Sequence, residues 1–159
     1  MAWARVATQW GEFYAVAQGQ SIAELRFPGP PPGEIGPSIP AVDRLARELR
    51  EYLQGTRTVF DLPLFLQGTE SQIAVWQELC RIPYGTTVTY GELARRVGRP
   101  RSARAVGQAV GANPVPIVIP CHRVLPMTGG LGGFGPGLQW KRWLLDLEGA
   151  RYSEKPSPR

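Results

Sequence analysis

Apolar and polar residues alternate loosely over residues 3–27, with glycines at Gly11 and Gly19. This pattern is typical of two or three short strands joined by tight turns. The proline- and glycine-rich stretch PGPPPGEIGPSIP follows and predicts a loop. Apolar residues then recur at helical spacing, and Gly55 is expected to end that helix. They are Val42, Leu45, Ala46, Leu49 and Leu53.

The stretch TVFDLPLFL predicts a short strand or an extended linker that leaves this first module. Up to that point the sequence shows no constellation of catalytic residues. The hydrophobic pattern therefore predicts a small α/β module over residues 1–67 and places the candidate chemistry in the remainder of the chain.

Two short amphipathic helices are predicted next, each behind a capping box. The boxes are formed by Thr69 with Gln72 and by Thr89 with Glu92. The apolar stripes are Ile73, Trp76, Leu79 and Cys80 on the first helix, and Tyr90, Leu93, Ala94 and Val97 on the second. Gly98 is expected to stop the second helix.

A third helix follows, and Ser102 is placed to cap it. Its inward face is expected to carry Ala103, Val106, Gly107 and Val110, and its outward face Arg104, Gln108 and Gly111. Two short helices joined by a tight glycine-containing turn form a helix-turn-helix pattern, although any helical hairpin gives a similar one. We therefore predict a mainly helical, winged helix-turn-helix-like domain over residues 68–150.

The last part of the sequence combines a glycine-rich loop with one more helix. The stretch TGGLGGFGPG lacks a GK[ST] motif, so a flexible lid or a close-approach loop is a better interpretation than a phosphate loop. Trp140, Trp143, Leu144 and Leu147 then define a helix that ends at Gly149. Residues 151–159 are expected to form a disordered tail.

Length and composition are compatible with one ordinary domain or two small ones, since the chain has 159 residues. Its apolar runs fall well short of the roughly 20 residues of a membrane span. The start MAWARVATQWGEF lacks the apolar core of a signal peptide. These features predict a cytoplasmic protein with no membrane partner.

The net charge of +5 is unevenly distributed along the chain. Residues 1–67 have a balance of −1 and residues 68–159 a balance of +6. The stretch RRVGRPRSAR, residues 95–104, contains five arginines and no acidic residue. Arginine suits phosphate groups, so nucleic acid is the favoured partner. A solvated basic surface without a nucleic-acid partner is the alternative.

Two cysteines, Cys80 and Cys121, allow at most one disulfide, and we expect free thiols in a reducing cytosol. A zinc site usually needs about four Cys, His or carboxylate ligands. With one histidine and two distant cysteines, we expect no metal and no other cofactor. Cys80 is expected to be a packing residue, because it lies on a helix stripe beside Leu79.

The segment NPVPIVIPCHRV carries the only histidine, His122, directly after Cys121. A nearby imidazole can generate the reactive thiolate. Neighbouring residues of a strand point to opposite faces, so contact through a bent backbone or a bridging water is expected. Glu148 is a candidate to orient the imidazole. The pattern also fits a Cys121 that packs as a small hydrophobe.

Four segments together resemble the O6-alkylguanine-DNA alkyltransferases. GANPVPIVIPCHRV resembles the active-site signature of that family, and the other three match it in order and spacing. These are VWQELCRIPYGTTVTYGELA, SARAVGQAVGANP and KRWLLDLEG. The resemblance is strong over residues 68–149 and loose over residues 1–67, where it implies a ribonuclease H-like domain.

The resemblance implies a DNA repair protein that flips O6-alkylguanine out of duplex DNA and transfers the alkyl group irreversibly to its own cysteine. Cys121 would accept the group, His122 would act as the base through water, and Glu148 would orient His122. Asn113 would hold the turn that links the recognition helix to the active site. Tyr90 would help to rotate the nucleotide and would give a proton to the leaving guanine.

The family pattern also implies the surfaces that meet DNA and the base. Arg104 would enter the stack where the flipped base was. Further DNA contacts are expected from Arg101, Ser102, Ala103, Gln108 and Arg123. The base pocket would be lined by Val110, Phe134 and Gly135. The partner would be double-stranded DNA with O6-alkylguanine, with O4-alkylthymine as a further candidate lesion, and the protein would be a monomer.

Two residues depart from the family pattern. The family often has tyrosine where this chain has Phe134, and Pro136 predicts a different lid shape. Three alternatives remain: a lesion-binding protein without transfer, a winged-helix transcription factor and a cysteine hydrolase. The first would lack the cysteine, the second would not need the Cys-His pair, and the third would turn over. Transfer of label from O6-methylguanine to the protein separates all three from the alkyltransferase.

Overall fold

The structure is a computed structural model that describes residues 2–99 and 102–153. It divides into two compact units, Met1–Gln67 and Gly68–Arg159. A small sheet with one helix in the first unit and mainly helices in the second confirm the expected mixed α/β class. The ribonuclease H-like character of the first unit stays a prediction. Within the described ranges, every helix is too short or too polar to cross a bilayer.

The first unit is built on an antiparallel sheet in the order β1-β2-β3. Its strands are β1 (Ala4–Thr8), β2 (Gly11–Gln18) and β3 (Ser21–Arg26). Gly11 and Gly19 have φ values of 118° and 60°, which favour glycine in the two tight turns. The alternation read from the sequence is thus confirmed as three strands. Its apolar positions form the buried face, with Val6, Phe13, Ala15, Ile22 and Leu25.

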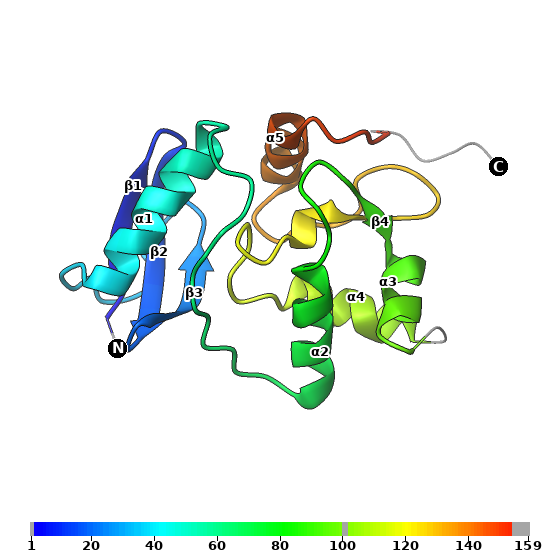
Figure 1. Cartoon of the computed structure of the whole chain (residues 1–159), viewed down its shortest axis with the longest axis horizontal. Helices are drawn as coiled ribbons and strands as arrows, with labels where there is room; N and C mark the ends of the chain where they lie inside the picture. Colours follow the sequence, from blue (N-terminus) through cyan, green and yellow to red (C-terminus); the bar gives the residue numbers. More distant parts are fainter. Residues whose placement is uncertain (1, 100–101, 154–159) are drawn as a thin grey trace. The chain divides into compact units, whose positions relative to one another are not determined.

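Helix α1 (Pro40–Leu53) packs against this sheet and begins with a proline in its first turn (Figure 1). The five apolar residues expected at helical spacing are all buried. The stretch after α1 is an extended linker, in which Leu64 makes only an isolated bridge to Ile22 of β3. Buried Glu48 of α1 accepts a hydrogen bond from the Asp61 amide at 2.8 Å, and this contact fixes the linker against the helix.

The second unit opens with α2 (Glu70–Leu79), and the capping box of Thr69 and Gln72 is confirmed. Helix α3 (Tyr90–Arg96) is capped by the Thr89 side chain, which accepts a hydrogen bond from the Glu92 amide. Helix α4 (Ala103–Gly111) follows α3 after a short turn, as the helix-turn-helix pattern predicted. Ser102 takes the N-cap position of α4, but its side chain makes no capping hydrogen bond.

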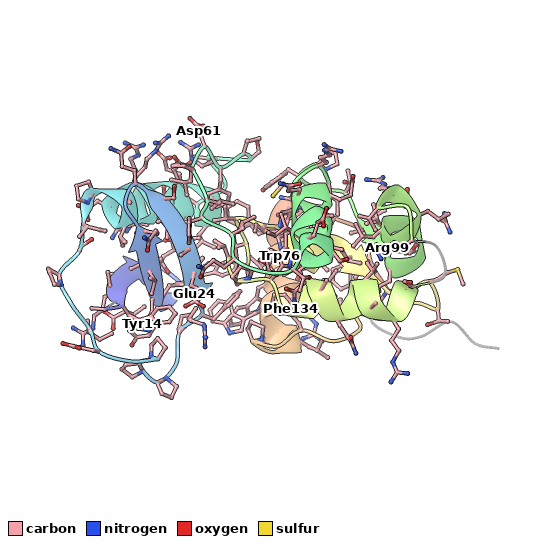
Figure 2. All side chains as sticks on the ribbon, turned by 90° about the horizontal axis from the view of Figure 1, so that it is seen from below. Tyr14, Glu24, Asp61, Trp76, Arg99 and Phe134 are labelled. Atoms are coloured by element: carbon pink, nitrogen blue, oxygen red, sulfur yellow. The ribbon has the colours of Figure 1, made fainter. Side chains whose placement is uncertain are left out.

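Helix α2 packs on α4 through a buried tryptophan. The indole Nε1 of Trp76 donates to the Ala109 carbonyl oxygen at 2.8 Å, and Trp76 is labelled in Figure 2. Burying this large ring with its polar atom satisfied holds the two helices at a fixed separation. The other side of α4 is exposed and carries Arg104 and Gln108, as the sequence predicted.

A short strand in the C-terminal half of this unit pairs with the residues directly before α3. Strand β4 (Val88–Thr89) pairs in parallel with β5 (Val124–Leu125). A single 3-10 turn, η1 (Cys121–Arg123), lies directly before β5, and α5 (Leu138–Glu148) packs on η1. The pairing therefore brings the Cys-His-Arg segment next to the first residue of α3, Tyr90.

One residue assigned to a buried stripe is exposed, and the buried face of α5 carries two charged residues. Cys80 is exposed, because α2 ends at Leu79 and Cys80 lies in the turn beyond it. On α5 the buried residues are Lys141, Leu144, Leu145 and Glu148, whereas Trp143 is exposed. Trp140 and Trp143 stack edge to face on each other, with ring centroids 5.3 Å apart. Each ring thus covers part of the other on the helix itself.

Candidate active site

The Cys-His-Arg segment forms a 3-10 turn rather than a strand. The Cys121 amide donates to the Ile119 carbonyl at 2.8 Å, and the Arg123 amide donates to the Pro120 carbonyl at 3.0 Å. All three side chains of the turn are buried. In such a turn successive side chains do not alternate between two faces as in a strand, so the bent backbone expected at this point is confirmed.

The backbone before Cys121 is tightly constrained. Ile117 is buried and has a φ of 75°, the left-handed region that a β-branched residue rarely adopts. Asn113 holds this stretch from both sides: its Nδ2 donates to the Ile119 carbonyl at 2.8 Å, and its Oδ1 accepts from the Val115 amide at 3.0 Å. Asn113 thereby connects the end of α4 to the segment that carries the thiol.

Glu148 gathers the polar groups around His122. Its Oε2 lies 2.8 Å from His122 Nε2 and accepts from Arg123 Nη2 at 2.9 Å. Its Oε1 accepts from Arg123 Nε at 2.8 Å and from the Gly85 amide at 3.1 Å. A carboxylate is an acceptor, so the Nε2 of His122 carries the proton and donates it to Glu148.

The other ring nitrogen of His122 is left with its lone pair. Nδ1 is buried and makes no hydrogen bond to any residue that the structure describes. A buried polar atom without a partner is rare and commonly marks a catalytic group or a bound water. His122 is therefore arranged as a neutral base next to Cys121.

Burial dominates the electrostatics of the thiol and of the imidazole. Burial raises the pKa of Cys121 to about 11, although a hydrogen bond from the Asn113 side chain and the charge of Lys141 both favour the thiolate. Burial likewise lowers the pKa of His122, against the opposing effect of Glu148. At neutral pH the thiol holds its proton and the imidazole is free to take it. Such a thiol reacts only if a base removes that proton.

Lys141 is a charged residue of the site that the sequence reading missed. Its side chain is fully buried, and Nζ donates to the Val124 carbonyl at 2.9 Å. Burial lowers the pKa of Lys141 to about 8, while a Cys121 thiolate would raise it. A signal was present, because Lys141 shares a helical face with Leu144, Leu145 and Glu148 at the spacing of a core stripe.

Tyr90 begins α3 and is half-buried. Burial, followed by the charge of a Cys121 thiolate, raises the pKa of its hydroxyl, which therefore keeps its proton near the thiol. A Cβ added at Gly107 of α4 or at Gly132 of the glycine-rich loop would come within 3.7 and 3.8 Å of the Tyr90 ring. The ring thus lies close to both of these segments.

The residues expected to contact DNA have different environments. Arg104 and Gln108 are exposed on α4, and Ser102 and Ala103 at its start are half-buried. Arg101 lies outside the described residues. Arg123 is the exception: its guanidinium is buried and bound to Glu148 and to the Ile82 carbonyl. The burial of Arg123 and these contacts do not favour the expected contact with DNA, and a DNA-binding role of this residue stays a prediction.

The residues expected to form the base pocket are also spread over two segments. Val110 is buried on α4, whereas Phe134 and Gly135 belong to the loop before α5, where Phe134 is half-buried and Gly135 exposed (Figure 2). In residues 2–99 and 102–153, no group of three or more His, Cys, Asp and Glu side chains is arranged to hold a metal ion.

Comparison with known proteins gives consistent matches. Residues 70–150 match the family model described as 6-O-methylguanine DNA methyltransferase, DNA binding domain. The inducible methylated-DNA–protein-cysteine methyltransferase of Bacillus subtilis is 40% identical over 158 residues, covering 96% of this chain and 87% of the relative. The Haemophilus influenzae protein of the same name is 40% identical over 151 residues, covering 91% and 84%.

Solved structures give the same result. The crystal structure of Mycobacterium tuberculosis OGT in complex with DNA superposes with a TM-score of 0.85 at 38% identity, covering 96% of each chain. The O6-methylguanine-DNA methyltransferase of Pyrococcus kodakaraensis superposes with a TM-score of 0.59 at 22% identity, covering 93% of this chain and 99% of that one. This more distant likeness supports the fold alone.

Proposed function

The chain belongs to the family of methylated-DNA–protein-cysteine methyltransferases, and we infer that Cys121 is the residue that accepts the alkyl group. Its partner is DNA. The lesion that we propose is O6-alkylguanine in duplex DNA, with O4-alkylthymine as a further candidate, and we propose that the protein acts as a monomer in the cytoplasm. The observation that carries the assignment is the contact of buried His122 with Glu148, which leaves Nδ1 without a hydrogen bond to any described residue, on the residue that directly follows Cys121 in the 3-10 turn.

The reaction begins with loss of the thiol proton. His122 Nδ1 takes it from Cys121 through a bridging water, and Glu148 stabilises the resulting imidazolium through Nε2. Lys141 and the Asn113 amide stabilise the thiolate that forms. These groups oppose the effect of burial, but the pKa of the thiol still stays at about 11, so the base must remove the proton.

The alkyl group then moves from oxygen to sulfur. The thiolate attacks the saturated carbon, a carbon–sulfur bond forms, and the bond from that carbon to O6 breaks. The electron pair of the broken bond remains on guanine, and Tyr90 supplies the proton that neutralises it. The thioether is stable to water, so each molecule reacts once.

The lesion must leave the duplex before this chemistry, since an alkyl group on O6 lies inside the base stack. Unstacking a base costs on the order of a few kcal/mol. The exposed Arg104 of α4 is proposed to fill the vacated place in the stack, and the basic residues 95–104 are proposed to bind phosphates. Asn113 then transmits the position of α4 to the thiol segment through its two hydrogen bonds.

Transfer of label tests this function directly. A duplex with radiolabelled O6-methylguanine is incubated with excess protein, and label is counted on the chain after denaturation. We expect at most one label per molecule for wild type, none for Cys121→Ala, and wild-type transfer for the matched variant Cys80→Ser, because Cys80 is exposed in the turn after α2 and has no proposed part in the reaction. Lesion binding without any label, or label on Cys121→Ala, would contradict the proposal.

A further inference from the structure

Arg123 is the residue that holds Glu148 in place. Its guanidinium grips the carboxylate with two donors, Nε to Oε1 at 2.8 Å and Nη2 to Oε2 at 2.9 Å. The same Oε2 is the acceptor for His122 Nε2. Arg123 and His122 therefore share one negative charge, and neither can move without disturbing the other's acceptor.

The guanidinium is itself fixed on its remaining sides. Nη1 donates to the Ile82 carbonyl at 2.6 Å, and the guanidinium carbon lies 5.7 Å from the centre of the Tyr84 ring. The Tyr84 hydroxyl in turn donates to the Leu147 carbonyl at 3.3 Å, one residue before Glu148. Only a planar fork makes two parallel bonds to a carboxylate and a third to a carbonyl, so lysine cannot reproduce this arrangement.

We propose that Arg123 is a positioning residue for alkyl transfer: it fixes the Glu148 carboxylate and shares its charge, so that His122 stays neutral and presents Nδ1 to Cys121. This rests on the function proposed above and extends it. Without Arg123, the whole charge of Glu148 would act on His122, and a protonated imidazole has no lone pair with which to take the thiol proton.

The charges around His122 determine the direction in which the loss of Arg123 shifts the pKa of His122. Glu148 on α5 raises the pKa of His122, whereas Arg123 in η1 and Lys141 on α5 lower it. The remaining titratable groups nearby are Cys121, Tyr84, Tyr90 and Cys80. We expect all four to be uncharged at neutral pH because desolvation raises each of their pKa values, which for Cys80 reflects the atoms packed around it although the residue reaches the surface. Removing the positive charge of Arg123 must therefore raise the pKa of His122.

The single histidine of the chain makes the test unambiguous, since every imidazole signal in a 15N spectrum comes from His122. We expect the wild type to show the Nε2–H tautomer over the neutral range. In Arg123→Gln, which removes the charge, we expect the titration midpoint of His122 to move up by about one pH unit. Arg123→Lys keeps the charge but not the fork, so its midpoint should stay close to that of the wild type.

The rate of transfer gives the second readout. Single-turnover transfer from free O6-benzylguanine avoids any effect on DNA binding and is followed from pH 5 to pH 9. In Arg123→Gln, the pH below which the transfer rate falls should rise together with the titration midpoint of His122. In Arg123→Lys, that pH should not change, while the maximal transfer rate should fall about tenfold. A loss of this size is expected when one charged hydrogen bond is removed. Arg81→Gln removes an exposed arginine of the same unit and should change neither readout.

Three results would overturn the inference. They are an unchanged His122 midpoint in a folded Arg123→Gln protein, an Arg123→Lys protein with the maximal transfer rate of wild type, and an Arg123→Lys midpoint that shifts as far as that of Arg123→Gln. If Arg123→Gln does not fold, Glu148→Gln is measured instead. This variant should lower the titration midpoint of His122. An unchanged midpoint in Glu148→Gln would also overturn the inference. Wild type that transfers no alkyl group would refute the proposed function instead, and the spectra would still test the role of Arg123.

Discussion

Replacing the buried Lys141 by methionine should remove a distinct dependence of protein stability on pH. Methionine has a similar length and no charge, so it fills the space among Leu144, Leu145 and the η1 turn with little rearrangement. The variant loses the hydrogen bond to the Val124 carbonyl, a loss that does not depend on pH. The difference in stability between the two proteins therefore isolates the titration of the ammonium group.

The size of the effect follows from the change in pKa on folding. Burial lowers the pKa of Lys141 from 10.5 to about 8. Between these two values the unfolded chain binds more protons than the folded protein, so the free energy of unfolding rises with pH in this window. Below about 8 the folded state bears the full cost of the buried charge. A shift of this size corresponds to about 3 kcal/mol.

The titration of Cys121 changes the stability with pH in the opposite direction, so its contribution must be separated from that of Lys141. Burial raises the pKa of its thiol from 9.0 to about 11, so the unfolded chain loses this proton first and stability falls as pH rises through that window. Both proteins retain Cys121. Subtracting the stability of Lys141→Met from that of wild type at each pH removes its contribution to first order.

Urea unfolding at pH 7.5, 8.5, 9.5 and 10.5, followed by tryptophan fluorescence, measures the difference. We expect the free energy of unfolding of wild type to rise by up to about 3 kcal/mol relative to that of Lys141→Met across this range. The slope of this difference against pH should correspond to about one proton. The difference in stability between wild type and Arg142→Met, which removes the neighbouring cation on α5 but keeps Lys141, should not change with pH. A difference between wild type and Lys141→Met that is flat with pH would mean that Lys141 is neutral or solvated in the folded protein, and the account of its burial would be wrong.

Three further predictions concern DNA and the base pocket. Arg104→Ala should slow repair in duplex DNA far more than reaction with free O6-benzylguanine, because the free base needs no extrusion; equal losses in the two assays would assign Arg104 another role. Binding to undamaged duplex should weaken as salt rises, since the basic residues 95–104 would displace counterions, and an affinity independent of salt in a titration would exclude that interface. Phe134→Tyr should speed single-turnover transfer several-fold and leave lesion affinity within about twofold, because a hydroxyl could bond to the charge that develops on guanine. A slower rate would show that the pocket is shaped around a ring without a hydroxyl.

Most of the secondary structure could be predicted from periodicity and caps, because those signals are local. The stripe of α1 and the capping box at Thr69 needed only neighbouring residues. On α5, one stripe carries Trp140, Trp143, Leu144 and Leu147 and a neighbouring stripe carries Lys141, Leu144, Leu145 and Glu148, so the apolar pattern alone does not point to the second. The tryptophans suggested one face, whereas the structure buries the other with Lys141 and Glu148. Which face is buried depends on what lies opposite, and that partner is η1, distant in sequence.

The same limit explains the candidate site. The motif around Cys121 and His122 could be read directly, because the residues are adjacent in the sequence. Arg123 looked like a surface cation because arginine is usually exposed, and its buried partners lie 25 and 41 positions away. The motif gives the candidate residues, but long-range contacts determine whether a charge faces solvent or a buried carboxylate.

The hydrogen bonds that complete the site also determine when a molecule becomes reactive. Those from Gly85 to Glu148 and from Tyr84 to Leu147 each join residues 63 positions apart. Such long-range contacts form late in folding, and α5 leaves the ribosome after the Cys121 segment. A nascent chain therefore carries its acceptor thiol before it has the carboxylate that activates the base. For a protein that reacts once, this order carries a cost: until the fold closes around Cys121, its thiol keeps the ordinary pKa of 9.0 rather than about 11, so an unfinished molecule can be used up by stray alkylating agents before it can act on a lesion.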